Sequence, residues 1–211
     1  MVGIIGKKLG MTSIFLENGD NIPCTVIEAV PCVVTHLKNL GGKEGYNAVQ
    51  LSTGEKPKKS WTKAAIGHFA KSNTDPKVIS MEFRNLRRFK PVENIKLGDF
   101  LGIDIFNENE WVDITGYSKG KGFQGVVKRH GFAGVGGRTH GQHNRGRHPG
   151  SLGASSFPSK VIKGMRMAGR TGNTKVKMLN LIIVKIEKER NLLFLKGAVP
   201  GPKGSYIKIE K

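Results

Sequence analysis

The sequence predicts a mainly β protein: an antiparallel β-barrel that carries a long, irregular, basic and glycine-rich extension, together with a small mixed insert. Short runs of β-branched and aromatic residues, bounded by Gly, Pro and Asn, occur in the first half and again near the end of the chain, as is typical of strands. Between them lies a segment without apolar periodicity. Strands on both sides of such a segment favour one closed or nearly closed barrel, because closure hides the edges that short strands would otherwise expose.

The strand-like runs of the first half are separated by residues that suit hairpin turns. In order, they read GMTSIF, NIPCTVIEAV, CVVTHLKNL, YNAVQLS, FLGIDIF and WVDITG. The stretch from Lys56 to Arg88, which includes KKSWTKAAIGHFAKS, predicts a small mixed insert with one short helix. Near the end, KMLNLIIVKIEKERNLLFLKGAV predicts two more strands joined by a polar turn. We therefore expect a barrel of residues 1–116 and 176–211, with the insert at about 56–90, and an extension of residues 117–175.

The chain is strongly basic, with 35 Lys and Arg against 16 Asp and Glu and a formal net charge of +19. Residues 114–186 contain 14 Lys or Arg and no carboxylate side chain, so most of the surplus lies in one third of the sequence. Such a surplus repels itself in isolation and normally exists because a polyanion neutralises it. Nucleic acid is the first candidate. A membrane surface would call for a basic amphipathic helix or a lipidation signal, and MVGIIGKKLG shows neither.

The sequence also bears on location and on cysteine chemistry. No stretch approaches the roughly eighteen apolar residues of a membrane span, and the apolar run at the start is too short for a signal peptide. We therefore expect a cytoplasmic protein. Cys24 and Cys32 are the only cysteines, and their spacing matches neither a zinc knuckle nor a redox CxxC. They are expected to be ordinary apolar strand residues.

The middle of the predicted extension lacks the side chains for a core. From Gly134 to Ser156 only Val135, Leu152 and Ala154 are apolar, which is too few to bury at either helix or strand period. Fifteen glycines fall between Gly116 and Gly172. Glycine lets a backbone approach a surface closely, so we interpret these residues as allowing contact with RNA, with a flexible surface loop as the alternative.

Two nucleotide-site motifs match literally in Gly120–Val127, the dinucleotide-binding glycine fingerprint and the kinase glycine-rich loop. The first needs a helix after the loop and a carboxylate about twenty residues on, whereas VVKRHGFAGVGG breaks into glycine and no acid follows until Glu187. A kinase needs a strand lysine and metal-binding acids in set motifs, and no such set is present. Neither nucleotide site is expected.

Metal binding, hydrolysis and base stacking on paired aromatics are also disfavoured. His140, His143 and His148 are interleaved with Arg145 and Arg147, which would repel a dication. The serines of this segment have histidines nearby but no local acid to orient them. Aromatic residues make up only 7% of the chain, which disfavours a sheet that stacks single-stranded bases. We therefore expect no enzyme activity, no cofactor and no metal.

His, Arg, Asn and Gln in a glycine-loosened chain suit hydrogen bonding to phosphate and stacking on bases. The residues expected to bind RNA are Lys7, Lys8, Lys119, Lys121, Lys128, Arg129, His130, Arg138, His140, His143, Asn144, Arg145, Arg147, His148, Lys160, Lys163, Arg166, Arg170 and Lys175.

Nine residues fall at a recognisable spacing: Phe106, Asp113, Gly116, Ser118, Gly120, Lys121, Gly122, Gly125 and Arg129. This spacing resembles the signature of the ribosomal protein L-three family, also called uL-three, and the sequence looks like its bacterial members. The resemblance covers essentially the whole chain, through GIIGKKLGMTSIF, SKGKGFQGVVKRHGF, RHPGSLG, KGMRMAGRTGN and NLLFLKGAVPG.

The resemblance implies a translation-protein-type β-barrel on the outside of the large ribosomal subunit. It also implies an extension that threads into large-subunit (23S-type) ribosomal RNA towards the peptidyl transferase centre, with its tip near His140 to Ser156. Such proteins bind early in subunit assembly and neighbour other ribosomal proteins. In some relatives a glutamine of the tip is methylated, but Ala154 stands at the matching position here, which puts that modification in doubt.

One alternative class shares the charge. A free-standing DNA-compacting protein or RNA chaperone would also be basic, but it would bind nucleic acids indiscriminately and would not need an acid-free insertion inside one barrel.

Overall fold

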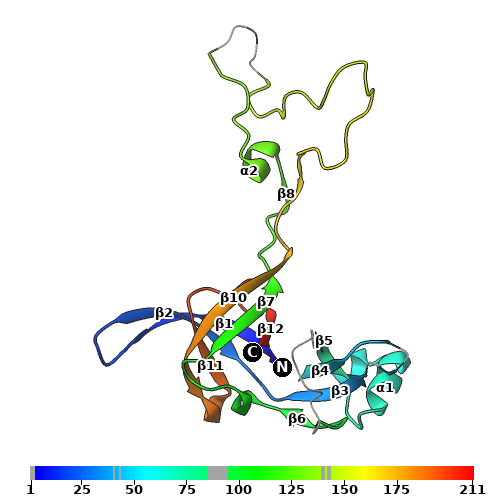
Figure 1. Cartoon of the computed structure of the whole chain (residues 1–211), viewed down its shortest axis with the longest axis vertical. Helices are drawn as coiled ribbons and strands as arrows, with labels where there is room; N and C mark the ends of the chain where they lie inside the picture. The colour runs from blue at the N-terminus through cyan, green and yellow to red at the C-terminus, as the bar shows by residue number, and fades with distance from the viewer. Residues whose placement is uncertain (1–2, 40, 43, 85–94, 139–140, 142–143) are drawn as a thin grey trace. The chain divides into compact units, whose positions relative to one another are not determined.

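The computed structural model describes residues 3–39, 41–42, 44–84, 95–138, 141 and 144–211. The chain divides into two compact units (Figure 1). The barrel unit comprises Met1–Tyr117 and Lys175–Lys211, and the extension unit comprises Ser118–Thr174.

The barrel unit is built on a closed barrel of six antiparallel strands, which confirms the predicted fold class. Around the barrel the order is β1-β12-β7-β10-β11-β2. The bounds are Gly3–Phe15 for β1, Asn21–Glu28 for β2, Trp111–Tyr117 for β7, Lys175–Glu187 for β10, Leu192–Lys196 for β11 and Tyr206–Glu210 for β12. β1 pairs with β12, so the first strand of the chain lies beside the last. A 3₁₀ turn, Lys188–Arg190, connects β10 to β11, where the sequence predicted a polar turn.

The predicted strands of the first half are present, but they divide between two sheets. Four strands form a separate sheet in the order β5-β4-β3-β6. Their bounds are Cys32–Lys38 for β3, Ala48–Glu55 for β4, Lys77–Arg84 for β5 and Phe100–Leu101 for β6. The insert is therefore larger than expected, and the run FLGIDIF is only a two-residue strand followed by the 3₁₀ turn Ile103–Ile105. Hydrophobic alternation marks a strand but does not name the strand with which it pairs.

The predicted short helix of the insert is α1, Lys63–Ala70, preceded by the 3₁₀ turn Lys58–Ser60. The hydroxyl of Thr62 caps the helix by accepting a hydrogen bond from the backbone N–H of Ala65, as Thr commonly does at this position. Only Phe69 of the helix is buried. α1 therefore buries little apolar surface.

The barrel and the small sheet share one hydrophobic core. Isoleucines from five barrel strands, β1, β2, β7, β10 and β12, are buried in one cluster with Val34, Leu51 and Phe83 of the small sheet. The ring of Phe83 approaches β1 so closely that a Cβ on Gly3 would lie 2.4 Å from it and 2.3 Å from the carbonyl oxygen of Ile209. Only glycine fits at this position, which is how the small sheet comes close to the barrel wall.

A charged cluster on the outer surface of the small sheet holds β3 to β5. The ammonium group of Lys38 donates to the hydroxyl of Tyr46 at 2.7 Å and to the carboxylate of Glu82 at 2.8 Å. The guanidinium of Arg84 donates to the other oxygen of Glu82 at 2.8 Å and lies 4.2 Å from the centre of the Tyr46 ring. Partial burial tends to raise the pKa of Glu82, but the hydrogen bonds from Lys38, Arg84 and Tyr46 outweigh it and lower the pKa to about 2.

This pKa predicts an acid-sensitive contribution to stability. The Glu82→Gln substitution should lower the free energy of unfolding at pH 7 by about 1–2 kcal/mol. This value is smaller than the full pKa shift implies, because solvent screens the partly exposed charges. A carboxylate whose pKa is lower in the folded state contributes stability above its unfolded pKa and loses it as the pH falls through its folded pKa. The difference between the two proteins should therefore shrink between about pH 4.5 and pH 2 in thermal unfolding curves. A difference that is independent of pH would contradict the assignment.

Candidate RNA interface

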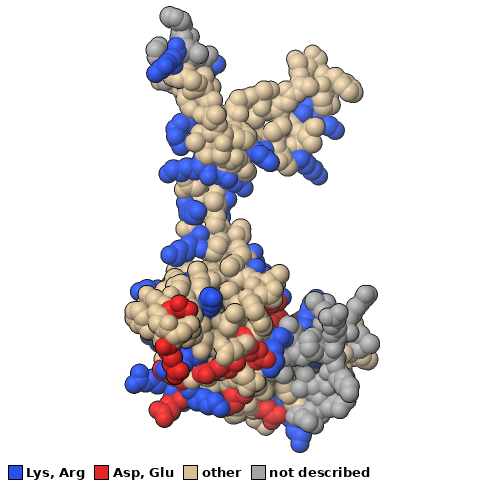
Figure 2. Space-filling model, turned by 60° about the vertical axis from the view of Figure 1, so that its left-hand side comes forward, with Lys and Arg blue, Asp and Glu red and all other residues tan. Residues whose placement is uncertain are grey.

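The extension unit is exposed and basic along its described length. It contains eleven Lys or Arg and no Asp or Glu. Val126 is the only buried residue among those that the structure describes in the unit. In Figure 2 this unit shows Lys and Arg in blue and no acidic residue on the visible face, whereas the barrel unit shows both signs of charge. A chain segment with this composition cannot be held by an apolar core of its own.

Backbone pairing holds the two ends of the extension unit together. The strands β8, Phe123–Gln124, and β9, Gly169–Arg170, pair antiparallel. Next to these two strands, the N–H of Lys121 donates a hydrogen bond to the carbonyl of Thr171 at 2.9 Å. The carbonyl of Gly122 accepts from the N–H of Thr171 at the same distance. The outgoing and returning chains are therefore fixed in register, which places Lys121 and Arg170 on one ladder.

A short helix follows the glycine loop, which corrects the expectation that the chain breaks directly into glycine there. α2 comprises Val126–His130 and ends at Gly131, whose φ of +73° is the left-handed conformation that glycine favours at a helix end. The guanidinium of Arg129 donates to the carbonyl of Met167 at 2.7 Å, and Nε2 of His130 lies 3.0 Å from the same oxygen. Both residues were predicted to bind RNA, and both tie the helix to the returning chain while Arg129 stays exposed.

The outer loop of the unit closes at a contact between Gly134 and Gly146. The N–H of Val135 donates to the carbonyl of Gly146 at 3.3 Å, and the φ of Gly134 is +77°. A Cβ on Gly134 would clash with that carbonyl oxygen, so the crossing requires glycine. The exposed residues Arg138, Asn144 and Arg145 lie on this loop, and Arg147 and His148, which are also exposed, follow directly after it. His140 and His143 were also predicted there, but they lie outside the described residues.

Several exposed apolar side chains in this unit were missed as interface candidates by the sequence analysis. Phe123 is 75% exposed and Phe157 is 89% exposed. Val161, Ile162, Met165 and Met167 are also exposed, alternating with Lys160, Lys163 and Arg166. The sequence did contain an indication of these contacts, because large apolar residues occur in a segment that has too few of them to form a core. Such side chains can contact sugars and unstacked bases.

Three of the residues that were predicted to bind RNA belong to the barrel unit, and they differ in how exposed they are. Lys7 on β1 and Lys175 on β10 are exposed. Lys8 is 7% exposed, and its ammonium group donates to the carbonyls of Val199 at 2.8 Å and Gly201 at 3.2 Å. A buried ammonium group that is engaged by the barrel's own backbone has little surface to offer a phosphate, so the structure disfavours Lys8 as an RNA contact.

Among the described residues, no helix is long and apolar enough to cross a membrane. No group of three or more His, Cys, Asp or Glu side chains among them is placed to hold a metal ion. Cys24 and Cys32 are both buried, as expected of apolar strand residues. Burial raises the pKa of the Cys32 thiol, and a backbone hydrogen bond to Ile5 counteracts this in part.

Comparison with known proteins agrees with this architecture. The family model described as ribosomal protein L3 matches residues 97–192, which include β7, the extension unit and β10. The chain is 50% identical over 210 residues to the protein named large ribosomal subunit protein uL3 from Salinibacter ruber, covering 99% of this chain and 98% of the relative. Identity of this extent over nearly the full length of both chains, together with the barrel and its acid-free insertion, establishes that the chain belongs to the ribosomal protein L3 family.

Proposed function

We propose that this protein is a structural constituent of the large ribosomal subunit and binds the large-subunit RNA through its extension unit. The observation that carries the proposal is that this unit contains eleven Lys or Arg and no carboxylate, with one buried side chain among its described residues. Family membership and the printed name of the relative support the same role. The protein's own contribution is structural, and it needs no cofactor.

Phosphate neutralisation is the physical mechanism that we propose for binding. Each Lys or Arg that meets a phosphate releases condensed counterions, which favours association and makes it depend on salt. The ladder at the base of the unit and the α2 contact with Met167 fix where the two chains run, while the glycine crossing at Gly134 lets them approach closely. The remaining segment takes its final order from the RNA that surrounds it.

A finer part of the proposal concerns assembly and the catalytic centre. Early binding during assembly, neighbouring ribosomal proteins and a tip that braces RNA near the peptidyl transferase centre rest on the family resemblance alone. Deleting residues 134–156 should leave the barrel folded but change peptide transfer or drug sensitivity of reconstituted subunits. Unchanged peptide transfer together with unchanged drug sensitivity would remove the bracing role.

Sedimentation of a cell lysate tests the main proposal. The protein should migrate with the large subunit at low salt and remain there at moderate salt, because a folded RNA surface engages many phosphates at once. The alternative is a free-standing nucleic-acid-binding protein or RNA chaperone. A protein of that kind would bind many different RNAs and would dissociate from them as the salt concentration rises. Such a distribution would contradict the ribosomal assignment.

A further inference from the structure

The hairpin made by β1 and β2 continues past the barrel. β12 pairs with β1 only from Gly3 to Lys7, and β11 pairs with β2 only from Cys24 to Glu28. Residues 11–22, here called the hairpin ribbon, therefore form two strands and a turn without a third strand beside them (Figure 1). Leu16 and Asp20 close the turn through a hydrogen bond from the N–H of Leu16 to the carbonyl of Asp20, at 2.9 Å.

The hairpin ribbon exposes large apolar side chains. Met11 is 54% exposed, Phe15 is 73% exposed and Leu16 is 38% exposed. Because side chains alternate along a strand, Met11 and Phe15 lie on the same face. Ile14 and Ile22 are cross-strand partners on the opposite face and are only half-buried. A two-stranded hairpin is at best marginally stable by itself in water, so this ribbon is suited to being covered.

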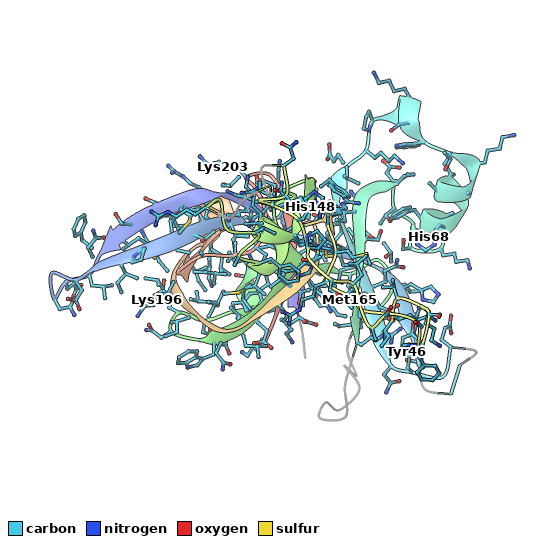
Figure 3. The ribbon with its side chains drawn as sticks, turned by 90° about the horizontal axis from the view of Figure 1, so that it is seen from above. Tyr46, His68, His148, Met165, Lys196 and Lys203 are labelled. Atoms are coloured by element: carbon cyan, nitrogen blue, oxygen red, sulfur yellow. The ribbon has the colours of Figure 1, made fainter. Side chains whose placement is uncertain are left out.

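The charge of the hairpin ribbon is opposite to that of the chain. Residues 9–37 contain no Lys or Arg, although the whole chain carries a net charge of +19. The tip carries Glu17 and Asp20, both exposed, and neither is in an ion pair within the described part of the chain. Lys196 pairs with Cys24, and Lys203 lies beside Gly10, so both lysines flank the barrel end of the hairpin (Figure 3). A phosphate surface would be repelled at the tip, unlike at the extension unit.

We propose that the hairpin ribbon is a docking surface for a basic protein, with Phe15 and Met11 entering an apolar socket and Glu17 and Asp20 facing Lys or Arg side chains of that partner. The inference rests on the proposed place of this chain in the large subunit, where the partner would be a neighbouring protein. Aromatic anchors in an apolar socket commonly dominate such interfaces, and complementary charges at the rim set partner choice and association rate.

Photo-crosslinking in isolated large subunits tests this inference. The Phe15→p-benzoylphenylalanine variant should give, on irradiation, an adduct that survives RNase and contains a peptide from a basic protein. The matched control is Phe123→p-benzoylphenylalanine, since Phe123 is equally exposed but lies on the extension unit. The control should crosslink to RNA and lose its adduct on RNase treatment. Both positions are on the surface, and circular dichroism checks that the variants fold.

The charges of the tip provide a second measurement. Adding Glu17→Lys and Asp20→Lys to the Phe15 photo-variant should reduce the yield of the protein adduct by about tenfold, while the chain still migrates with large subunits. Three results would contradict the proposed docking surface. They are an RNase-sensitive adduct at position 15, the absence of any adduct there, and an adduct yield that does not change when the charges are reversed. Failure of the unmodified protein to enter large subunits would instead overturn the proposed function.

Discussion

Binding of the full-length protein to a large-subunit RNA fragment is expected to weaken by about 10³–10⁵-fold between 50 and 200 mM salt. If roughly eight of the basic side chains meet phosphates, the logarithm of affinity should fall with the logarithm of salt at a slope near −6 to −7. The reason is that the extension unit offers eleven cations and no carboxylate to compete with the RNA for them. Filter binding or fluorescence titration over a salt series measures the slope.

Two variants make this result specific to the extension unit. Arg145→Ala, which removes an exposed cation of the outer loop, should make the slope shallower by about 0.7–0.9. Replacing residues 118–174 with a short Gly-Ser turn should remove most of the slope. Tyr117 and Lys175 are already cross-strand partners, so the barrel can close without the unit. A slope shallower than about −2 for the full-length protein would contradict the proposal.

Substituting the buried lysine should affect stability and leave RNA binding intact. Lys8→Met keeps the aliphatic stem but leaves the carbonyls of Val199 and Gly201 without the donor they have now. An unsatisfied buried acceptor costs about 1–3 kcal/mol, so the free energy of unfolding should fall by about 2 kcal/mol, with a melting temperature lower by about 4–8 °C. Urea unfolding and calorimetry measure these changes.

The neighbouring residue is the control for this experiment. Lys7 is exposed on the same strand, so Lys7→Met should change the free energy of unfolding by no more than about 0.5 kcal/mol. The salt slope for RNA binding should be the same for Lys8→Met and the unmodified protein. A shallower slope for Lys8→Met, without loss of stability, would restore Lys8 to the RNA interface.

The sequence predicted the barrel class because β-branched runs on both sides of an unpatterned segment leave few other arrangements. It did not predict β12, because Tyr206–Glu210 is a five-residue run that follows a loop rich in Gly and Pro. Nor could it assign β3 and β4 to a second sheet, since the partner of each strand is decided by contacts that are distant in sequence. The packing of Phe83 against Gly3 is such a contact.

The candidate interface was predictable as a segment and less so as individual residues. Charge is visible in a sequence, so the acid-free stretch was found directly. Burial is not visible, so Lys8 was grouped with exposed lysines although the loop at Val199 encloses it. Arg129 also has an internal partner, the carbonyl of Met167, which only the return of the chain along β9 brings within reach.

The pairing of β1 with β12 has a consequence for synthesis of the protein. A barrel whose first and last strands are neighbours cannot close until the C-terminal strand has been translated. The extension unit is made before β10, β11 and β12, so the nascent chain displays its full cationic segment while the barrel is still open. Free polyanions in the cell can capture that segment prematurely. We therefore expect newly made chains to be captured by such polyanions more readily than a protein of ordinary charge.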